Sequence, residues 1–215
     1  MNKILKDDSY VAVIPQYAVS DDTANLQLPN PYLAAYYNDV ENRIYRIEGE
    51  VSSDLLELCR LIVMWNKEDE SVPIEERKPI RIVIFSPGGD LYTFRSLRAH
   101  IKLSKTPIIA INEGKAMSAG AYIYLSCPIR YAVKGAKLLV HYGEISLANN
   151  GKDAVEQLKS YEKELEELVD VIQEASDFTR EQIKSNLSQD WIIDDNVQVE
   201  HKMTDKIIDD ISLLY

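Results

Sequence analysis

The sequence predicts an α/β fold in which short strands alternate with helices and form a parallel or mixed sheet. Short apolar runs rich in β-branched residues, at 81–85, 107–112 and 138–140, have the length of buried strands. The first two runs are each followed by a glycine-bearing turn and then by a segment with apolar residues at helical spacing, at 91–104 and 118–125. The same strand–turn–helix unit therefore occurs twice in succession.

The first 40 residues predict an irregular opening. Tyr10 to Ile14 can form a short strand, and three prolines, at positions 15, 29 and 31, interrupt any long element. The 215-residue chain is long enough for one α/β domain with a full core. We therefore divide it into a divergent N-terminal segment, residues 1–40, and a single domain, residues 41–215.

A strand and a helix are expected next. Apolar and polar residues alternate from Arg43 to Glu50, which predicts a strand. Ser52 or Ser53 can cap the helix that follows, whose apolar residues recur at helical spacing: Leu55, Leu58, Cys59, Ile62 and Trp65. The charged stretch 66–79 contains prolines and has no strong periodicity, so it predicts a loop.

The two repeated units follow. The strand at 81–85 ends in Ser86-Pro87-Gly88-Gly89, and Asp90 can cap a helix that runs to about Ser104. The second unit leads into a helix that begins at Ser118.

The clearest helix of the chain spans Lys152 to Gln173. Its apolar residues recur every three or four positions, with Glu and Lys on the other face. Such a helix can cover the core of its own subunit. It can also meet its copy in another subunit, because the apolar spacing is close to a heptad.

Composition excludes several classes of protein. The formal charge of −11 argues against a nucleic-acid-binding surface, and no apolar run approaches the roughly 18 residues that span a bilayer. The N-terminus shows no secretory signal, and Cys59 and Cys127 fit buried thiols in a reducing compartment, so we expect a cytoplasmic protein. No metal-ligand spacing and no P-loop are present, so we expect no metal and no cofactor. An energy-dependent step must come from a partner.

Ser118 is the candidate nucleophile. It lies between small residues, in Gly114-Lys115-Ala116-Met117-Ser118-Ala119-Gly120, where a strand leads into an apolar helix. A tight turn there can expose the hydroxyl, and the N–H of Ala119 and the helix dipole favour negative charge beside it. Taken alone, however, the residue is more typical of an ordinary N-cap serine.

A serine nucleophile needs a base, and the chain has three histidines. His100 lies in an amphipathic helical pattern, and His201 lies in a polar segment where we expect it to face water. His141 ends the strand at 138–140, where sites commonly form in α/β proteins. Its position favours His141 as the base.

The orienting acid is the least determined member, because 35 carboxylates compete. Asp190 is the candidate because it adjoins the apolar, aromatic stretch Trp191-Ile192-Ile193, which can hold it in place. A buried carboxylate fixes the tautomer of the imidazole and stabilises the imidazolium. Gly88 and Gly89, which have no Cβ, can let a substrate backbone approach and can turn their N–H groups to an oxyanion, or they can simply form a tight turn.

These motifs together resemble the Clp protease proteolytic subunit family, the caseinolytic serine peptidases. Ser86-Pro87-Gly88-Gly89, the segment 114–120, Leu139-Val140-His141 and the stretch 183–205 are similar, in that order, to the motifs of that family. The resemblance covers about residues 43 to 212 and implies a Clp protease/crotonase-like fold of stacked βαβ units with a protruding interface helix.

The resemblance also implies the roles of the site residues. Ser118 is the nucleophile, His141 the general base and Asp190 the orienting acid, and the backbone N–H groups of Gly89 and Ala119 form the oxyanion hole. It further implies an endopeptidase for unfolded polypeptides, a homo-oligomer of heptameric rings that can stack in pairs, and a separate AAA+ ATPase. Neither nucleic acid nor membrane is expected as a partner.

Three other interpretations remain. The chain can be a non-catalytic ring subunit or scaffold that keeps the motifs, although no triad residue is missing. It can be a serine–lysine peptidase related to signal peptide peptidases, against which His141, Asp190 and the lack of an anchor segment count. A crotonase-type acyl-CoA enzyme shares a related fold, but such sites generally lack the triad.

Overall fold

A computed structural model of the protein describes residues 3–7, 10–14, 30–143 and 151–214. The chain divides into two compact units, Met1–Arg43 and Ile44–Tyr215. In the part of the chain that the structure describes, no helix is long and apolar enough to cross a membrane.

The first unit contains more regular structure than the sequence predicts. The expected strand β2 (Tyr10–Ile14) is present and pairs in antiparallel fashion with β1 (Lys3–Asp7). The expectation that the opening is irregular to about residue 40 is wrong, because α1 (Pro31–Glu41) lies there and begins at Pro31. Proline suits the first position of a helix, where its missing N–H has no intrahelical partner, and the Asn30 side chain accepts the N–H of Tyr32 at 3.0 Å.

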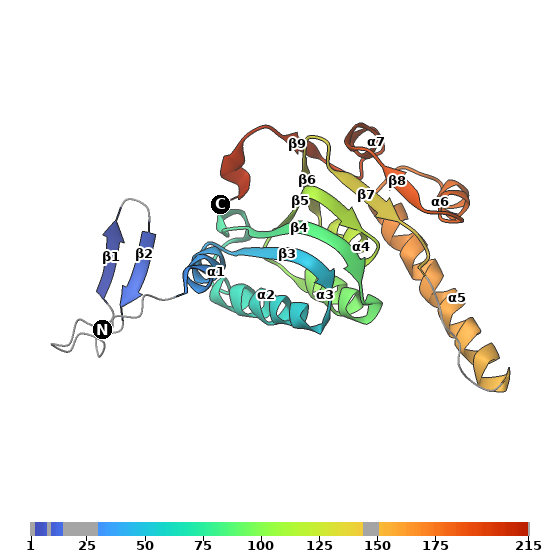
Figure 1. The fold of residues 1–215 in the computed structure, drawn as a ribbon, viewed down its shortest axis with the longest axis horizontal. Helices are drawn as coiled ribbons and strands as arrows, with labels where there is room; N and C mark the ends of the chain where they lie inside the picture. Colours follow the sequence, from blue (N-terminus) through green and yellow to red (C-terminus); the bar gives the residue numbers. More distant parts are fainter. Residues whose placement is uncertain (1–2, 8–9, 15–29, 144–150, 215) are drawn as a thin grey trace. The chain divides into compact units, whose positions relative to one another are not determined.

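The second unit is built on a largely parallel sheet, which confirms the predicted α/β fold (Figure 1). Five strands lie in parallel in the order β3-β4-β5-β6-β9: β3 (Ile44–Val51), β4 (Ile80–Gly89), β5 (Ile108–Met117), β6 (Ile129–Val133) and β9 (Lys206–Ile208). Two further strands, β7 (Lys137–Val140) and β8 (Trp191–Ile193), extend the sheet beside the end of β5.

Strands β4 and β5 run further than predicted, through Gly89 and Met117. The pairing of β4 shifts register beyond Ile84, so the ladder continues past the irregularity instead of ending there. The glycine-bearing segments are therefore the last residues of strands, not separate turns.

Strand β5 pairs with two different neighbours. Residues 109–112 pair with β6, whereas residues 115–117 pair with β7. Strand β7 in turn pairs with β8 in antiparallel fashion. The end of β5 is thus connected through β7 to a segment more than 70 residues later in the chain.

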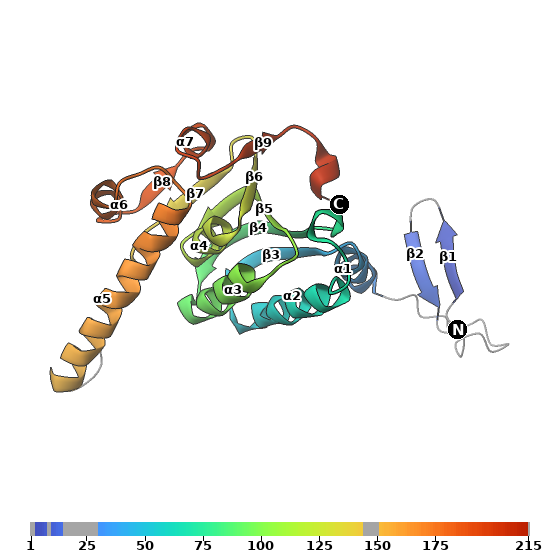
Figure 2. The same ribbon diagram turned by 180° about the vertical axis from the view of Figure 1, so that it is seen from behind.

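Helices α2 (Leu56–Glu68), α3 (Leu91–Leu103) and α4 (Ala119–Ser126) lie next to one another against the sheet, as Figures 1 and 2 show. Every residue of α4 is buried. Asp90 caps α3 as predicted, since its Oδ1 accepts the N–H of Thr93 at 2.7 Å. The predicted serine cap of α2 is wrong: a 3-10 turn, Ser53–Leu55, leads into the helix, and the Ser52 side chain makes no capping hydrogen bond.

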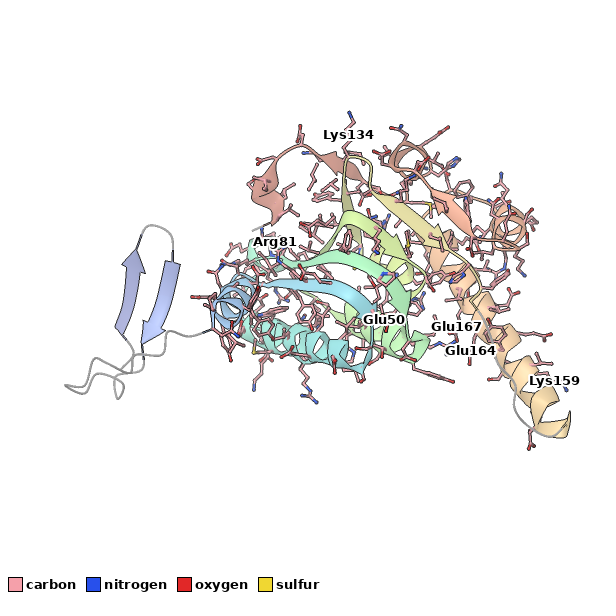
Figure 3. The ribbon with its side chains drawn as sticks, viewed as in Figure 1. Glu50, Arg81, Lys134, Lys159, Glu164 and Glu167 are labelled. Atoms are coloured by element: carbon pink, nitrogen blue, oxygen red, sulfur yellow. The ribbon has the colours of Figure 1, made fainter. Side chains whose placement is uncertain are left out.

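The predicted long helix is confirmed as α5 (Gly151–Glu174), whose N-terminal part extends away from the rest of the unit (Figures 1 and 2). Its C-terminal part packs into the core through Leu168, Val169 and Ile172. Glu164 and Glu167 lie along the helix, with Lys159 further out (Figure 3), and both glutamates pair with Arg95 of α3, at 3.2 and 3.1 Å.

The remaining elements of the unit are short. They are two short helices, α6 (Arg180–Asn186) and α7 (Asp195–Glu200), and two 3-10 turns, Ile74–Glu76 and Ile211–Leu214. Helix α6 precedes β8 and is tied to α5 by Arg180 and Lys184, both of which bond to Glu166.

Candidate active site

Ser118 lies between the end of β5 and the start of α4, with φ 49° and ψ −125°. A residue with a Cβ is strained in this region, at a cost of order 1–3 kcal/mol. Its N–H donates to the carbonyl of Leu139 at 2.7 Å, and its side chain makes no capping hydrogen bond to α4. The N-cap interpretation of Ser118 is therefore wrong for its hydroxyl, which points elsewhere.

The pairing of β5 with β7 brings His141 to Ser118. Met117 is paired with Leu139, so the residue that follows β7 lies beside the residue that follows β5. His141 Nε2 is 2.9 Å from Ser118 Oγ, a hydrogen-bond distance. The imidazole is partly exposed, with 30% of its side-chain surface accessible. A neutral imidazole in this position can accept the hydroxyl proton.

The pairing of β7 with β8 brings Asp190 to the other side of the same ring. Val140 is paired with Trp191, so the antiparallel register places His141 opposite Asp190. Asp190 Oδ1 lies 3.2 Å from His141 Nδ1. The three predicted residues therefore form one line: Ser118, His141 and Asp190.

The expectation that apolar neighbours bury Asp190 is wrong. Its side chain is 69% exposed in this single chain. Its neighbour Trp191 packs edge-on against Phe178, with ring centroids 5.0 Å apart. The apolar stretch thus fixes the backbone of β8, while the carboxylate lies beside His141 and remains largely exposed.

The glycine pair lies against the nucleophile. A Cβ on Gly88 would come within 2.6 Å of Ser118 Cβ and 3.2 Å of the nitrogen of Ala119, so only glycine fits there. The N–H of Gly88 donates to Ser86 Oγ at 3.1 Å. The N–H of Gly89, the next in the chain, is the one that we assign to an oxyanion below.

The other two histidines lie elsewhere. His100 Nδ1 lies 2.8 Å from the carbonyl of Ser96 within α3. The expectation that His201 simply faces water is wrong: its ring stacks on Phe178 at 3.9 Å, and Nδ1 lies 2.8 Å from Asp177 Oδ1. The hydrogen bond from His201 lowers the pKa of Asp177. Neither ring contacts Ser118.

Both cysteines are free and buried, as the sequence predicts. Burial raises the pKa of the Cys127 thiol to about 12 and also raises that of Cys59. Neither thiol is therefore a thiolate near neutral pH. Within residues 3–7, 10–14, 30–143 and 151–214, no group of three or more His, Cys, Asp or Glu side chains is placed to hold a metal ion.

Two tyrosines at the site were missed by the sequence analysis. Tyr122 donates its hydroxyl to the carbonyl of His141 at 2.7 Å, and Tyr161 donates to the carbonyl of Tyr142 at 2.8 Å. Tyr122 lies one helical turn after Ser118, and this four-residue spacing can be read from the sequence. Nothing in the sequence showed that its hydroxyl would reach the carbonyl of His141.

A serine, an imidazole and a carboxylate aligned at the end of a parallel strand are the constellation of the serine hydrolases. The family model of the Clp protease matches residues 35–210, and the chain belongs to this family. The family membership expected from the sequence motifs is therefore confirmed.

Individual relatives are distant but cover most of the chain. An ATP-dependent Clp protease proteolytic subunit of Deinococcus radiodurans is 22% identical over 165 residues, 76% of each chain. Subunit 2 from Treponema pallidum is 24% identical over 174 residues, 79% of this chain and 84% of the relative. Among solved structures, a mutant ClpP1 from Listeria monocytogenes has a TM-score of 0.69 at 22% identity and covers 84% of this chain and 99% of its own. That similarity shows the fold, a Clp-protease-type α/β fold with a protruding helix.

Proposed function

We propose that this chain is a serine endopeptidase that hydrolyses peptide bonds of unfolded polypeptides. Ser118 is the nucleophile, His141 the general base and Asp190 the orienting acid. The observation that carries the proposal is the 2.9 Å contact between His141 Nε2 and Ser118 Oγ. It is supported by the positive φ of Ser118, since a strained strand-to-helix turn is how hydrolases expose a serine.

The geometry supports a two-step acyl transfer. His141 Nε2 takes the proton of Ser118 Oγ as the oxygen attacks the scissile carbonyl carbon, and the same nitrogen then protonates the leaving amine. Water then attacks the carbonyl carbon of the acyl-serine ester. His141 Nε2 takes a proton from this water and gives it to Ser118 Oγ as the bond between that oxygen and the acyl carbon breaks, which releases the carboxylic acid product. The base contributes about 10²–10⁴-fold.

The oxyanion hole is assigned to the N–H groups of Gly89 and Ala119. The nitrogen of Ala119 is the first of α4, so the positive end of the helix dipole supports negative charge there. It also lies next to Gly88, which brings the glycine pair and the start of the helix together. Each donor contributes about 10²–10³-fold.

The domain that carries this activity comprises residues 41–215, with residues 1–40 outside it. We propose that it assembles in heptameric rings that can stack in pairs, with the exposed part of α5 at a subunit interface. Leu158 on this part of the helix is 43% exposed, which suits an apolar contact with another copy. The relatives are named ATP-dependent, so we assign ATP hydrolysis to a separate AAA+ partner in the cytoplasm.

A fluorophosphonate probe tests the proposal. The probe should label the wild type and fail to label Ser118→Ala or, at a much reduced rate, His141→Ala. Equal labelling of wild type and Ser118→Ala would contradict the assignment of the nucleophile. Native mass spectrometry tests the ring, and a stable monomer would contradict it.

Labelling, assembly and coenzyme A binding distinguish the alternative functions. A non-catalytic ring subunit would assemble without labelling. A serine–lysine peptidase would keep its labelling in His141→Ala, but here the Ser118 hydroxyl bonds to an imidazole. A crotonase-type enzyme would bind an acyl-CoA thioester, and binding of coenzyme A would reveal it.

A further inference from the structure

We propose that Tyr122 and Tyr161 are positioning residues that hold the base His141 in place by binding two consecutive backbone carbonyls. The inference rests on the proposed function, in which His141 is the base. It concerns how the protein fixes the separation of base and nucleophile.

The backbone at His141 needs such support because the ladder of β7 ends at Val140. Residues 141–143 belong to no strand. The two carbonyls that follow the last ladder pair are instead bound by phenol hydroxyls: that of His141 by Tyr122 at 2.7 Å, and that of Tyr142 by Tyr161 at 2.8 Å. The side chains thus replace two missing ladder partners.

Tyr122 links the base to the nucleophile through one turn of helix. Its N–H donates to the carbonyl of Ser118 at 3.0 Å, and its hydroxyl reaches the carbonyl of His141. The side chain is fully buried, and its ring packs against Phe94, with centroids 5.7 Å apart. Burial also raises the pKa of the phenol, so the hydroxyl remains a donor at neutral pH. The position of Ser118 and that of the His141 backbone are therefore set by the same rigid element.

Tyr161 makes the second attachment from a different helix. It lies on α5, which Glu164 and Glu167 join to Arg95 of α3. Its hydroxyl lies 4.0 Å from the position that a Cβ on Gly143 would occupy. Tyr142, the residue after the base, is thereby fixed relative to α5.

The chain provides a matched control in Tyr124. It lies on the same helix and is equally buried, and its hydroxyl also makes hydrogen bonds, to Thr204 Oγ1 at 2.7 Å and to the carbonyl of Tyr131 at 3.1 Å. Those partners lie away from Ser118 and His141. A phenylalanine at either position removes one buried hydroxyl, so a purely structural role predicts the same effect for both changes.

The test compares the rate constant for labelling by a fluorophosphonate, together with kcat and KM for a peptide substrate, among the assembled wild type, Tyr122→Phe, Tyr161→Phe and Tyr124→Phe. A misplacement near 1 Å costs about 10²-fold, so Tyr122→Phe should lower kcat and the labelling rate about 10- to 100-fold with KM unchanged. Tyr161→Phe should act in the same direction and less strongly. Tyr124→Phe should stay within about twofold of the wild type.

Each outcome decides the inference. If a folded Tyr122→Phe labels as fast as the wild type, or if Tyr124→Phe slows equally, the positioning role is wrong. If Tyr122→Phe does not fold, the labelling rate of Tyr161→Phe decides the positioning role. Tyr161 lies on α5 and is only half-buried, so its hydroxyl can be removed with less effect on folding.

If the wild type itself does not label, the proposed function fails, and a spectrum then decides the positioning role separately. With isotope-labelled histidine the chain gives three imidazole signals, and His141→Ala identifies that of His141. A signal changed by Tyr122→Phe and not by Tyr124→Phe supports the inference. An unchanged signal overturns it.

Discussion

His141 and Asp190 meet because Val140 is paired with Trp191 in the antiparallel ladder of β7 and β8. The parallel ladder of β5 and β7 places the same histidine beside Ser118. The short strand β7 ends directly before His141 and pairs with the segments of both partners, so it places the base between Ser118 and Asp190. The register of two ladders, not the sequence spacing, assembles the site.

The exposure of Asp190 predicts a modest role for its charge in the isolated chain. Solvent weakens an ion pair whose carboxylate is 69% exposed. We expect Asp190→Asn to lower kcat about 10- to 100-fold, less than the roughly 10⁴-fold of a buried triad acid. Wild-type activity should also fall as salt rises, because salt screens exposed pairs.

The control is Asp194→Asn, which removes an exposed carboxylate that pairs with Lys137 at 3.1 Å and should leave kcat unchanged. A loss near 10⁴-fold in Asp190→Asn would contradict this prediction and would show that the exposed carboxylate fixes the tautomer of His141 as strongly as a buried one.

Gly88 should tolerate no side chain. A Cβ there would lie 2.6 Å from Ser118 Cβ and 2.7 Å from the carbonyl of Met117, so Gly88→Ala should displace the nucleophile and abolish labelling by the fluorophosphonate. Gly135→Ala is the matched control. Gly135 also has a positive φ, 83°, but nothing lies within 4 Å of an added Cβ, so that variant should keep its activity. It should lose about 1 kcal/mol of stability from backbone strain alone.

Ser118 should store strain that glycine releases. Its φ of 49° costs of order 1–3 kcal/mol for a residue with a Cβ. Glycine removes this strain, but it also raises the conformational entropy of the unfolded chain, which offsets part of the gain in stability. We expect Ser118→Gly to be more stable than Ser118→Ala by about 1 kcal/mol, although both are inactive. Calorimetry at one protein concentration measures the difference. Equal melting temperatures would contradict the strain.

The cap of α3 should give a measurable pH dependence. Burial acts to raise the pKa of Asp90, but hydrogen bonds from Thr93 outweigh it and hold this pKa below its ordinary value. A depressed carboxyl pKa adds stability above the unfolded value near 3.9, and this contribution is lost as the pH falls through the folded pKa.

Asp90→Ala should therefore cost about 1 kcal/mol at pH 7. Asp90→Asn keeps a capping oxygen without a titrating group, so its stability relative to wild type should improve between pH 4 and pH 2. Denaturant unfolding across this range measures both variants. A constant difference between wild type and Asp90→Asn would show that the carboxylate charge adds nothing to the cap.

Several parts of this protein could be predicted because their signals are local. The two strand–helix pairs, the Asp90 cap and the long helix α5 each follow from periodicity or from a residue at a helix end. Ser118 and His141 could be proposed because both lie where a predicted strand ends. The start of α1 at Pro31 was missed, although proline at a first helical position is also a local signal.

Other parts depend on contacts between distant segments. Strands β8 and β9, of three residues each, are too short to show periodicity and exist only through their pairing with β7 and β6. The stacking of His201 on Phe178 and the exposure of Asp190 depend on how these segments pack.

The sequence by itself therefore determined the class of fold and the chemical groups of the candidate site, since residue type and periodicity are properties of neighbouring residues. Only the tertiary structure decided that the Ser118 hydroxyl faces His141 instead of capping α4. It alone placed the Tyr122 hydroxyl on the His141 carbonyl. The physical reason is that a hydrogen bond depends on distance and direction in space, and strand register sets both.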